Sequence, residues 1–284
     1  MRIKNRIKKR LGKVNAFLKS RRKPTVKAIH ILRLEVKHLE AFTELMAMQN
    51  NFGAKPEIPG RLEKLFQEAG KLRKLGLETK AIRSITDLNK LIKPTLFLKR
   101  LRSYEKKSSR RLRKKQKGYT AFKIRDIVKH PGVWLSSATC KQFLSARASS
   151  ILDLLNQDII SDIRSLHQLR KILKSIIYVM PLCNKGVKPV QSFLKTRKKF
   201  LQAVESKIGS LHDTGLFINW MEKRHELIET SEAPALKKIK REWHHDIRAM
   251  KKNLQPLLPA VRQFAVDLKD QTVVNLSAVK MTVN

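Results

Sequence analysis

The chain has little glycine, little proline and few cysteines, and each shortage argues against a class of protein. Glycine and proline contribute 10 residues each to a chain of 284, about 7% together where an average chain has roughly 12%. This scarcity argues against a hairpin-rich β architecture and against glycine-rich nucleotide loops. The two cysteines, Cys140 and Cys183, form no Cys-x-x-Cys pair, so we expect reduced thiols in a cytoplasmic protein.

Long apolar runs are also missing. The basic segment 1–20 never reaches the apolar run of roughly 7–15 residues that a secretory signal requires. The longest apolar stretches, such as 176–180, fall far short of the roughly 20 residues that a membrane span requires. We therefore predict a cytoplasmic protein with no membrane span.

Acidic residues are scarce relative to basic ones. Asp and Glu total 23 against 63 Lys and Arg, which gives a formal net charge of +40 at pH 7. Hydrophobic residues make up 42% of the chain. Because this is a globular composition, the charge decorates a folded body and not a disordered tail. A folded body of this charge suits a polyanionic partner.

Apolar residues recur at helical spacing along most of the chain. One such stripe consists of Ile29, Leu32, Val36 and Leu39, and the segment 158–180 carries a similar one. These patterns predict an all-α fold, and the last twenty residues stay unassigned. The predicted helices, separated mostly by prolines and placed to within a few residues, cover 25–50, 60–75, 78–93, 95–129, 134–157, 158–180, 189–208, 212–230 and 234–254.

Two strongly basic segments each have two interpretations. Residues 1–23 contain eleven basic residues and no acid, with apolar residues at helical spacing. This amphipathic helix either docks on its own domain, which we favour, or lies on a membrane surface. Residues 99–129 hold fourteen basic residues and two acids, and this run is either a solvated helix or an extension of an anion-binding path. Its basic centre contains Lys106, Lys107, Arg110, Arg111, Arg113, Lys114 and Lys115.

The sequence contains an internal repeat. The segment 28–42 aligns with 165–179 at an offset of 137, and in both copies a His is followed by Arg at the third position and Lys at the seventh. At about 100° per residue these three side chains share one stripe of a helix, away from the apolar face. The repeated residues are His30, Arg33 and Lys37 in the first copy and His167, Arg170 and Lys174 in the second, where Lys171 and Tyr178 extend the stripe.

A second matching pair follows each copy of this helix. The segment 69–76 aligns with 208–215 at an offset of 139, which places Arg73 opposite His212 and Lys74 opposite an aspartate. Two correlated matches predict a duplication into two pseudo-symmetric helical bundle halves. If the symmetry axis runs between the cationic faces, they meet in a basic central channel, where an anion relieves their mutual repulsion. The predicted divisions are a basic N-terminal helix at 1–23, the two halves at 24–132 and 133–259, and a C-terminal tail at 260–284.

The doubled motif resembles the CHAD domain, the conserved-histidine α-helical domain. The resemblance covers roughly residues 20–258 and rests on H-x-x-R-x-x-x-K, which opens a long helix twice and is followed each time by Gly-x-Leu-[Arg/His]-[Lys/Asp]. It implies two bundle-like halves around a basic channel that binds inorganic polyphosphate. The E-x-E-x-K element of the triphosphate-tunnel domain that often accompanies this family is absent, which implies a stand-alone module. The implied ligands are His30, Arg33, Lys37, His167, Arg170, Lys171, Lys174 and Tyr178, and the second repeated element adds Arg73, Lys74 and His212 as candidates.

Some positions depart from the pattern of that family. His38, Glu40, Ser175 and Ile177 stand where further basic residues are common, so the channel is expected to be less charged there. Tyr178 is as well suited to packing as to phosphate contact.

Polyphosphate carries regularly spaced negative charges and no bases, so its recognition requires cations and N–H donors but no stacking surface. Arg offers bidentate donors, Lys a point charge, and His a charge that grows on acidification. We therefore predict a non-enzymatic polyphosphate-binding protein without cofactor, which polyphosphate granules would attract. Its binding is expected to tighten between about pH 7.5 and 6 as His30 and His167 gain protons.

Nucleic acid is the alternative ligand, because its phosphate backbone neutralises the same charge whatever the base sequence. Aromatic residues make up 6% of the chain, and few interleave with the basic stripes, which disfavours a base-stacking platform.

A metal-dependent phosphohydrolase is the third hypothesis. The pair His212-Asp213 resembles the metal-binding HD pair of phosphohydrolases, and His244 is adjacent to His245. Side chains of adjacent residues on a helix point about 100° apart, so they do not converge on one metal ion. The second repeated element already accounts for the pair His212-Asp213, and an aspartate is favoured near the helix start that we expect there. We therefore predict neither a metal site nor catalysis.

Overall fold

The computed structural model shows an all-helical protein. It describes residues 3–20, 23–49, 58–127, 135–183, 188–223 and 228–272, and every regular element among them is a helix. The predicted all-α class is confirmed. The α-helices are α1 (Ile3–Lys19), α2 (Val26–Gln49), α3 (Gly60–Leu88), α4 (Thr95–Gly118), α5 (Ser137–Leu155), α6 (Ile163–Val179), α7 (Lys188–Glu222), α8 (Ala233–Leu254) and α9 (Leu258–Thr272), with short 3-10 turns η1 (Ile124–Asp126), η3 (Thr230–Glu232) and η4 (Gln255–Leu257).

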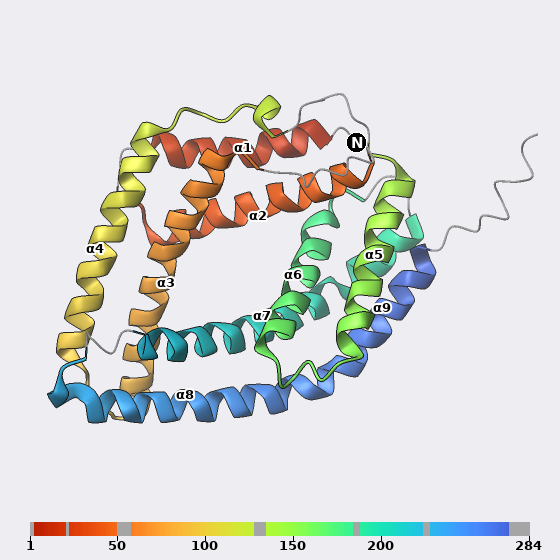
Figure 1. Cartoon of the computed structure of the whole chain (residues 1–284). Coiled ribbons are helices and arrows are strands. Elements are labelled where there is room, and N and C mark those ends of the chain that lie inside the picture. Colours follow the sequence, from red (N-terminus) through yellow and green to blue (C-terminus); the bar gives the residue numbers. More distant parts are fainter. Residues whose placement is uncertain are drawn as a thin grey trace, which may run out of the picture.

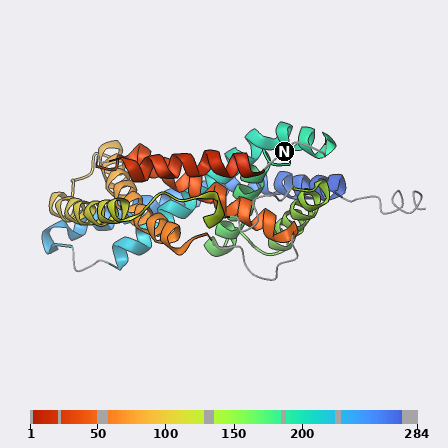
Figure 2. The ribbon, with the colours of Figure 1, turned by 90° about the horizontal axis from the view of Figure 1, so that it is seen from above.

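The helices form an elongated, flat body. In Figure 1, α3 and α4 pack together at one end, and α5 and α9 pack together at the other. Helices α2 and α7 run between the ends, and α6 packs against both of them near the middle. Helix α8 follows one edge and contacts α3 and α7. Seen from above, the body is thin (Figure 2).

The apolar core is divided into two clusters. The larger one is built from α1, α2, α5, α6 and α9 with parts of α3 and α7, and it contains fully buried side chains such as Leu32, Leu169 and Phe264. The smaller one joins α3, α4, α7 and α8 around Phe97 and Trp243. Burial of each such side chain contributes about 1.5–3 kcal/mol. The N-terminal parts of α3 and α7 are buried in the larger cluster and their C-terminal parts in the smaller one, so both long helices are anchored along their length.

Helix α1 packs on the rest of the domain. Its apolar stripe, which includes Ile7 and Leu11, is buried against α2. Two of its cations, Arg10 and Lys13, lie 2.8 and 2.7 Å from the carboxylate of Glu35, a residue that is 1% exposed. Because a buried carboxylate requires paired charges, these contacts fix the orientation of α1, and they correspond to the docked interpretation of the basic N-terminal segment.

Two helices are longer than the sequence analysis predicted. The pairs expected at 60–75 and 78–93, and at 189–208 and 212–230, are the single helices α3 and α7. The predicted breaks fall at glycines inside the second repeated element, and the structure shows that these glycines lie within continuous helices. Helix α4 in turn ends at Gly118, earlier than the predicted 129.

The C-terminal segment differs from the predicted tail at 260–284. Residues 258–272 form α9, whose side chains Val261, Phe264 and Leu268 are buried against α5. The apolar residues of α9 recur at helical spacing, which the sequence analysis did not use because it left this end unassigned. Residues 273–284 lie outside the described part.

Two further sequence expectations concern the cysteines and membrane spans. Cys140 and Cys183 are buried in the larger cluster as free thiols. Within the described ranges, no helix combines the length and the apolar character that crossing a bilayer demands.

Candidate anion-binding site

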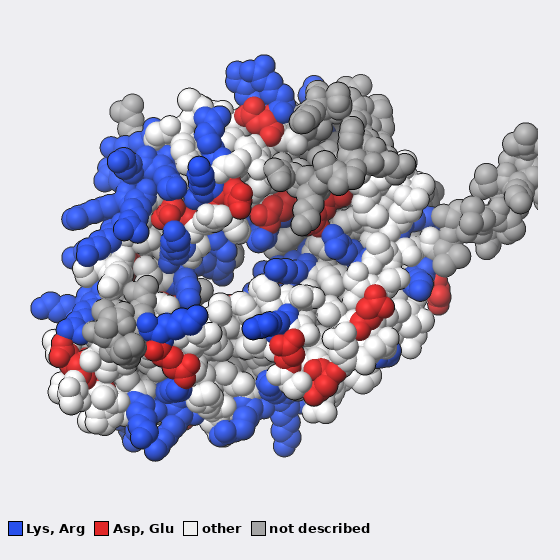
Figure 3. Space-filling model, viewed as in Figure 1, with Lys and Arg blue, Asp and Glu red and all other residues white. Residues whose placement is uncertain are grey.

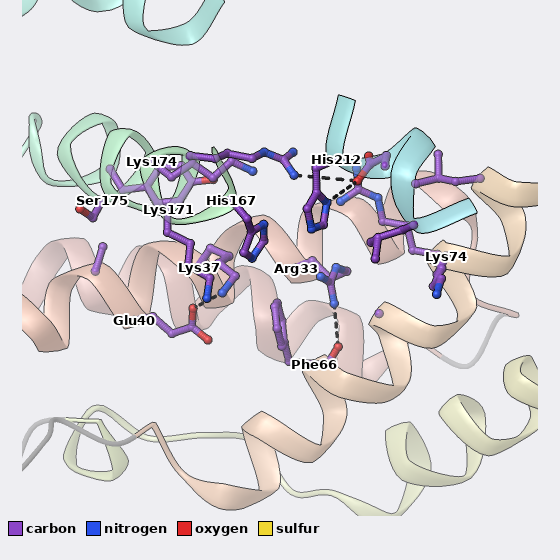
Figure 4. Close-up of a pocket in the computed structure, with 18 of the residues that line it drawn as sticks. Arg33, Lys37, Glu40, Phe66, Lys74, His167, Lys171, Lys174, Ser175 and His212 are labelled. Atoms are coloured by element: carbon purple, nitrogen blue, oxygen red, sulfur yellow. Dashed lines mark hydrogen bonds and ion pairs between the residues drawn. The ribbon is translucent and has the colours of Figure 1, made fainter. Parts of the chain in front are cut away.

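Cations from both copies of the repeat line one cavity. The cavity has a volume of about 490 Å³ and lies between α2, α3, α6 and α7. Figure 3 shows a hollow in the middle of the broad face, bordered by Lys and Arg, and Figure 4 shows the side chains of the cavity. The predicted ligands in its lining are Arg33, Lys37, Arg73, Lys74, His167, Arg170, Lys171, Lys174, Tyr178 and His212.

Each cationic stripe lies on a helix whose other face is buried. On α2, Leu32 and Val36 are fully buried in the core, and Arg33 and Lys37 follow them directly on the face that borders the cavity. The leucines of α6 are buried in the same way, and α2 packs against α6. Because the two helices share one interface, their cationic faces border the same space.

The start of α6 is fixed by a side-chain cap. Asp162 accepts hydrogen bonds from the backbone N–H groups of Arg164 and Ser165 at 2.9 and 3.1 Å. The first N–H groups of a helix have no partner within it, so this cap sets the residue at which α6 begins. The buried leucines of α6 set which face carries the cationic stripe.

Arg33 is held on α3 by three contacts. Its Nη1 donates a hydrogen bond to the backbone oxygen of Phe66 at 3.0 Å, and its guanidinium lies 4.1 Å from the centre of the Phe66 ring. The guanidinium also occupies the space beside Gly70, where a Cβ atom would overlap Nη1. Lys37 approaches the same ring, with Nζ 4.9 Å from its centre. These cation–π contacts orient both cations at the cavity wall.

Arg170 is held on α7 in a comparable way. Its Nε donates to Oε1 of Glu205 at 2.8 Å, and the same oxygen lies 3.0 Å from Nζ of Lys174. A Cβ atom at Gly209 would lie 2.6 Å from Nη2 of Arg170, too close for any real contact. Gly209 therefore has the same relation to Arg170 that Gly70 has to Arg33.

These glycines make room for the two arginines, and the list of candidate residues drawn from the sequence did not include them. In a helix interior, Gly is about 1 kcal/mol less favourable than Ala. Gly70 and Gly209 each leave room for a guanidinium of the repeat. The signal was present in the sequence, because both glycines belong to the second repeated element at the offset of 139.

Cations of the cavity lower one another's pKa. Burial, followed by the charge of Arg73, lowers the pKa of Arg33. Burial, followed by the charge of Arg170, lowers the pKa of Lys174, although Glu205 acts in the opposite direction. Such shifts arise where like charges are crowded at reduced dielectric, so an anion that enters this cavity is attracted by several cations together.

Two histidines stack within the cavity. The rings of His167 on α6 and His212 on α7 lie 4.2 Å apart with an angle of 19° between their planes, and Figure 4 shows them among the cations. Burial lowers the pKa of His167 to about 4, with further contributions from His212, Lys171 and other neighbouring cations. His167 is therefore neutral at pH 7.

Carboxylates interrupt the basic lining, and the sequence analysis gave them too little weight. Oε2 of Glu40 lies 2.7 Å from Nζ of Lys37. Asp213, expected near a helix start, lies in the middle of α7, and its Oδ1 is 3.4 Å from Nδ1 of His212. Burial raises the pKa of Asp213, but the His212 contact and the charge of Arg170 outweigh this effect and lower it. Asp213 is therefore an ionised carboxylate in the cavity.

Tyr178 combines ring packing with a place in the cavity wall. Its ring packs 4.2 Å from that of His38, and the residue also borders the cavity. Burial raises the pKa of Tyr178 to about 12. The phenol is thus protonated at physiological pH and offers an O–H donor to an anion.

His30 is the predicted ligand that the first cavity does not include. It lines a second cavity of about 850 Å³ between α2, α3 and α4, together with Arg73. Burial, followed by the charges of Arg73, Lys174 and Arg33, lowers the pKa of His30. His30 lies about one helical turn before Arg33 on α2, and at that level α2 borders the cavity that α4 also lines.

The metal hypothesis finds no cluster of ligands. Among the described residues, no group of three His, Cys, Asp or Glu is placed to hold a metal ion. His212 and Asp213 are adjacent on α7 and contact each other, and His244 and His245 are exposed on α8.

Comparisons with known proteins gave no match. No protein-family model, no curated protein and no solved structure is significantly similar to this chain.

The site predicts a pH dependence at lower pH than the sequence suggested. If an anion binds beside His167, it raises the pKa of this histidine above about 4, so anion binding is expected to tighten as the pH falls and to level off below about pH 4. A pKa difference of one unit corresponds to tenfold in affinity below both pKa values and to about threefold at pH 4.5. We therefore expect about threefold tightening between pH 7 and pH 4.5, measured by calorimetry with polyphosphate at constant ionic strength.

Two variants test this assignment. His167→Gln is expected to flatten the pH profile, whereas His244→Gln, on the exposed surface of α8, is expected to leave it unchanged. If the affinity of His167→Gln depends on pH as strongly as that of the wild type, protonation of His167 is not the cause of the pH dependence.

Proposed function

We propose that this protein binds inorganic polyphosphate in the cavity between α2, α3, α6 and α7. The observation that carries the proposal is the convergence of both repeated cationic stripes on one cavity of about 490 Å³. Stripes on opposite sides of the molecule would have left no common ligand to infer.

We also propose that the two halves arose by duplication and are pseudo-symmetric, as in the CHAD family. The relation of Arg33 to Gly70 and of Arg170 to Gly209 supports this, because each arginine of the first element occupies space left by a glycine of the second. The offsets of 137 and 139 residues relate the two pairs. At one related position the copies differ, since Phe66 contacts Arg33 whereas Glu205 contacts Arg170.

The chemistry of the lining favours a linear phosphate polymer without bases. Four cations, Arg33, Arg170, Lys37 and Lys174, offer charged donors from two adjoining helices, which suits several phosphate oxygens along a chain. Arg33 and Lys37 lie over the ring of Phe66 and compete with a nucleobase for the ring face that they cover. We propose a binding protein and no catalytic activity, located in the cytoplasm and drawn to polyphosphate granules.

Calorimetric competition between polyphosphate and RNA at physiological salt tests this proposal. We expect saturable binding of polyphosphate, and we expect polyphosphate to displace RNA while RNA fails to displace polyphosphate. Binding in which RNA displaces polyphosphate would favour the nucleic-acid alternative and overturn the proposal. Salt should be held constant, because every phosphate contact releases counterions and makes the affinity salt-dependent.

The same samples provide a control for catalysis. Long-chain polyphosphate incubated with the protein, with and without a divalent metal ion, is expected to release no phosphate. Release that His212→Ala abolishes would make this site an active site.

A further inference from the structure

The second cavity lies beside the first and is also basic. It is bounded by α2, α3 and α4, and has a volume of about 850 Å³. Helix α3 contributes Lys80 and Arg83, and α4 contributes Arg102 and Lys106. Its acidic lining consists of Asp87 and Glu105, and Asp87 is already paired with Lys93 at 2.7 Å. The cavity therefore retains an excess of positive charge.

The two cavities meet on α3. Arg73 and Leu77 line both of them, so a ligand in the first cavity that reaches Arg73 lies beside the second. The electrostatics agree with this geometry, because the charges of Arg33 and Lys174 in the first cavity contribute to the lowered pKa of His30 in the second. An anionic chain that leaves the first cavity past Arg73 thus enters a region of the same sign.

The cations of the second cavity continue along the helix axes. Arg73 and Arg83 are ten residues apart on α3, which corresponds to about 15 Å along the axis. Arg102 and Lys106 are four residues apart on α4 and so share one face of that helix. A linear polyphosphate of many units follows such a row, whereas tripolyphosphate covers a fraction of it.

We propose that the second cavity is a further subsite for linear polyphosphate, which makes this protein selective for long chains over tripolyphosphate. This inference rests on the proposed function, because it requires the chain to start in the first cavity. It also assigns a ligand contact to part of the basic segment 99–129. The sequence alone did not decide whether this segment is a solvated helix or an extension of an anion-binding path.

A paired set of variants on α4 tests the subsite. Arg102→Ala with Lys106→Ala removes the two α4 cations of the second cavity, both of which are exposed and free to change without loss of core packing. Arg110→Ala with Lys114→Ala is the matched control, since these residues have the same types and spacing on the same helix, are exposed, and line neither cavity. Binding of long-chain polyphosphate and of tripolyphosphate is measured by calorimetry at constant salt.

We expect the Arg102/Lys106 variant to bind long-chain polyphosphate about tenfold more weakly and tripolyphosphate within about twofold of wild type. The dependence of long-chain affinity on salt should also become shallower, by about 1.4 in a double-logarithmic plot for two lost contacts, by analogy with single-stranded nucleic acid. The control variant is expected to change either affinity by less than about twofold.

Three outcomes overturn the second subsite: unchanged long-chain affinity in the Arg102/Lys106 variant, an equal loss for tripolyphosphate, or an equal loss in the Arg110/Lys114 control. If wild type binds polyphosphate of every length alike and the variant changes nothing, the first cavity alone is the site. If wild type binds no polyphosphate, the proposed function itself is wrong.

Discussion

Simultaneous replacement of Arg33, Lys37, Arg170 and Lys174 by alanine is expected to weaken polyphosphate binding about a thousandfold. Each residue offers a charge-assisted contact from the wall of the first cavity, and a loss of about 1 kcal/mol per contact sums to about 4 kcal/mol. A difference of this size is about three orders of magnitude in Kd. Isothermal calorimetry with long-chain polyphosphate measures it.

A matched control separates a defined cavity from general electrostatic attraction. It removes the same number of Arg and Lys residues from α4, where they are exposed and line neither cavity. We expect less than about tenfold weakening in this control, through the reduced net charge alone. Comparable losses in the two variants would mean that attraction is diffuse and that the cavity has no special role. The control residues are Arg110, Arg111, Lys114 and Lys117.

The loss must also be distinguished from unfolding. Removal of Arg170 and Lys174 leaves the half-buried carboxylate of Glu205 without its two cations, and an unpaired charge of this kind is destabilising. Addition of Glu205→Gln to the quadruple variant is expected to raise the melting temperature and to leave the affinity low. Recovery of binding together with stability would attribute the loss to the fold.

Replacement of Gly70 and Gly209 by alanine is expected to weaken polyphosphate binding and to favour the helical conformation of the backbone. Gly70→Ala places a Cβ atom against the guanidinium of Arg33, and Gly209→Ala does the same to Arg170. The arginine side chain is flexible and moves away, so it no longer points at the ligand. We expect about tenfold weaker binding for each variant and about a hundredfold for both together, each factor of ten being about 1.4 kcal/mol.

The fold should tolerate these substitutions. Alanine in a helix interior is favoured over glycine by about 1 kcal/mol, which offsets the loss of the hydrogen bond between Arg33 and Phe66, also about 1 kcal/mol. Gly12→Ala in α1 is the control, because a Cβ atom there meets nothing within 4 Å. It is expected to stabilise the protein without any change in binding. Full affinity in the double variant, measured beside thermal melts, would refute the role of the glycines.

Local periodicity was sufficient to predict the helices and their cationic faces. The spacing of residues such as Leu32 and Val36 fixes which side of a helix is buried, and the opposite side then carries Arg33 and Lys37. This relation depends on about 3.6 residues per turn and on no distant contact. The repeat added the expectation that two such faces share a ligand.

Element boundaries depended on contacts that local rules do not contain. The predicted breaks fell at Gly76 in α3 and at Gly209 in α7, yet both helices are continuous. Arg33 and Arg170 occupy the space beside Gly70 and Gly209, and such contacts join parts of the chain that are far apart in sequence. The pairing of Glu205 with Arg170 and Lys174 was equally out of reach. Its partners lie on another helix, more than thirty residues away in the chain.

The sequence by itself determined the all-helical class, the repeat and the residues that form each cationic stripe, because these follow from composition and from spacing within one helix. The tertiary structure decided which stripes border a common cavity, that His30 and the basic face of α4 belong to a second one, and which carboxylates neutralise the cations. Those properties depend on how helices pack against one another, and residues that are neighbours in space through packing carry no fixed spacing in the chain.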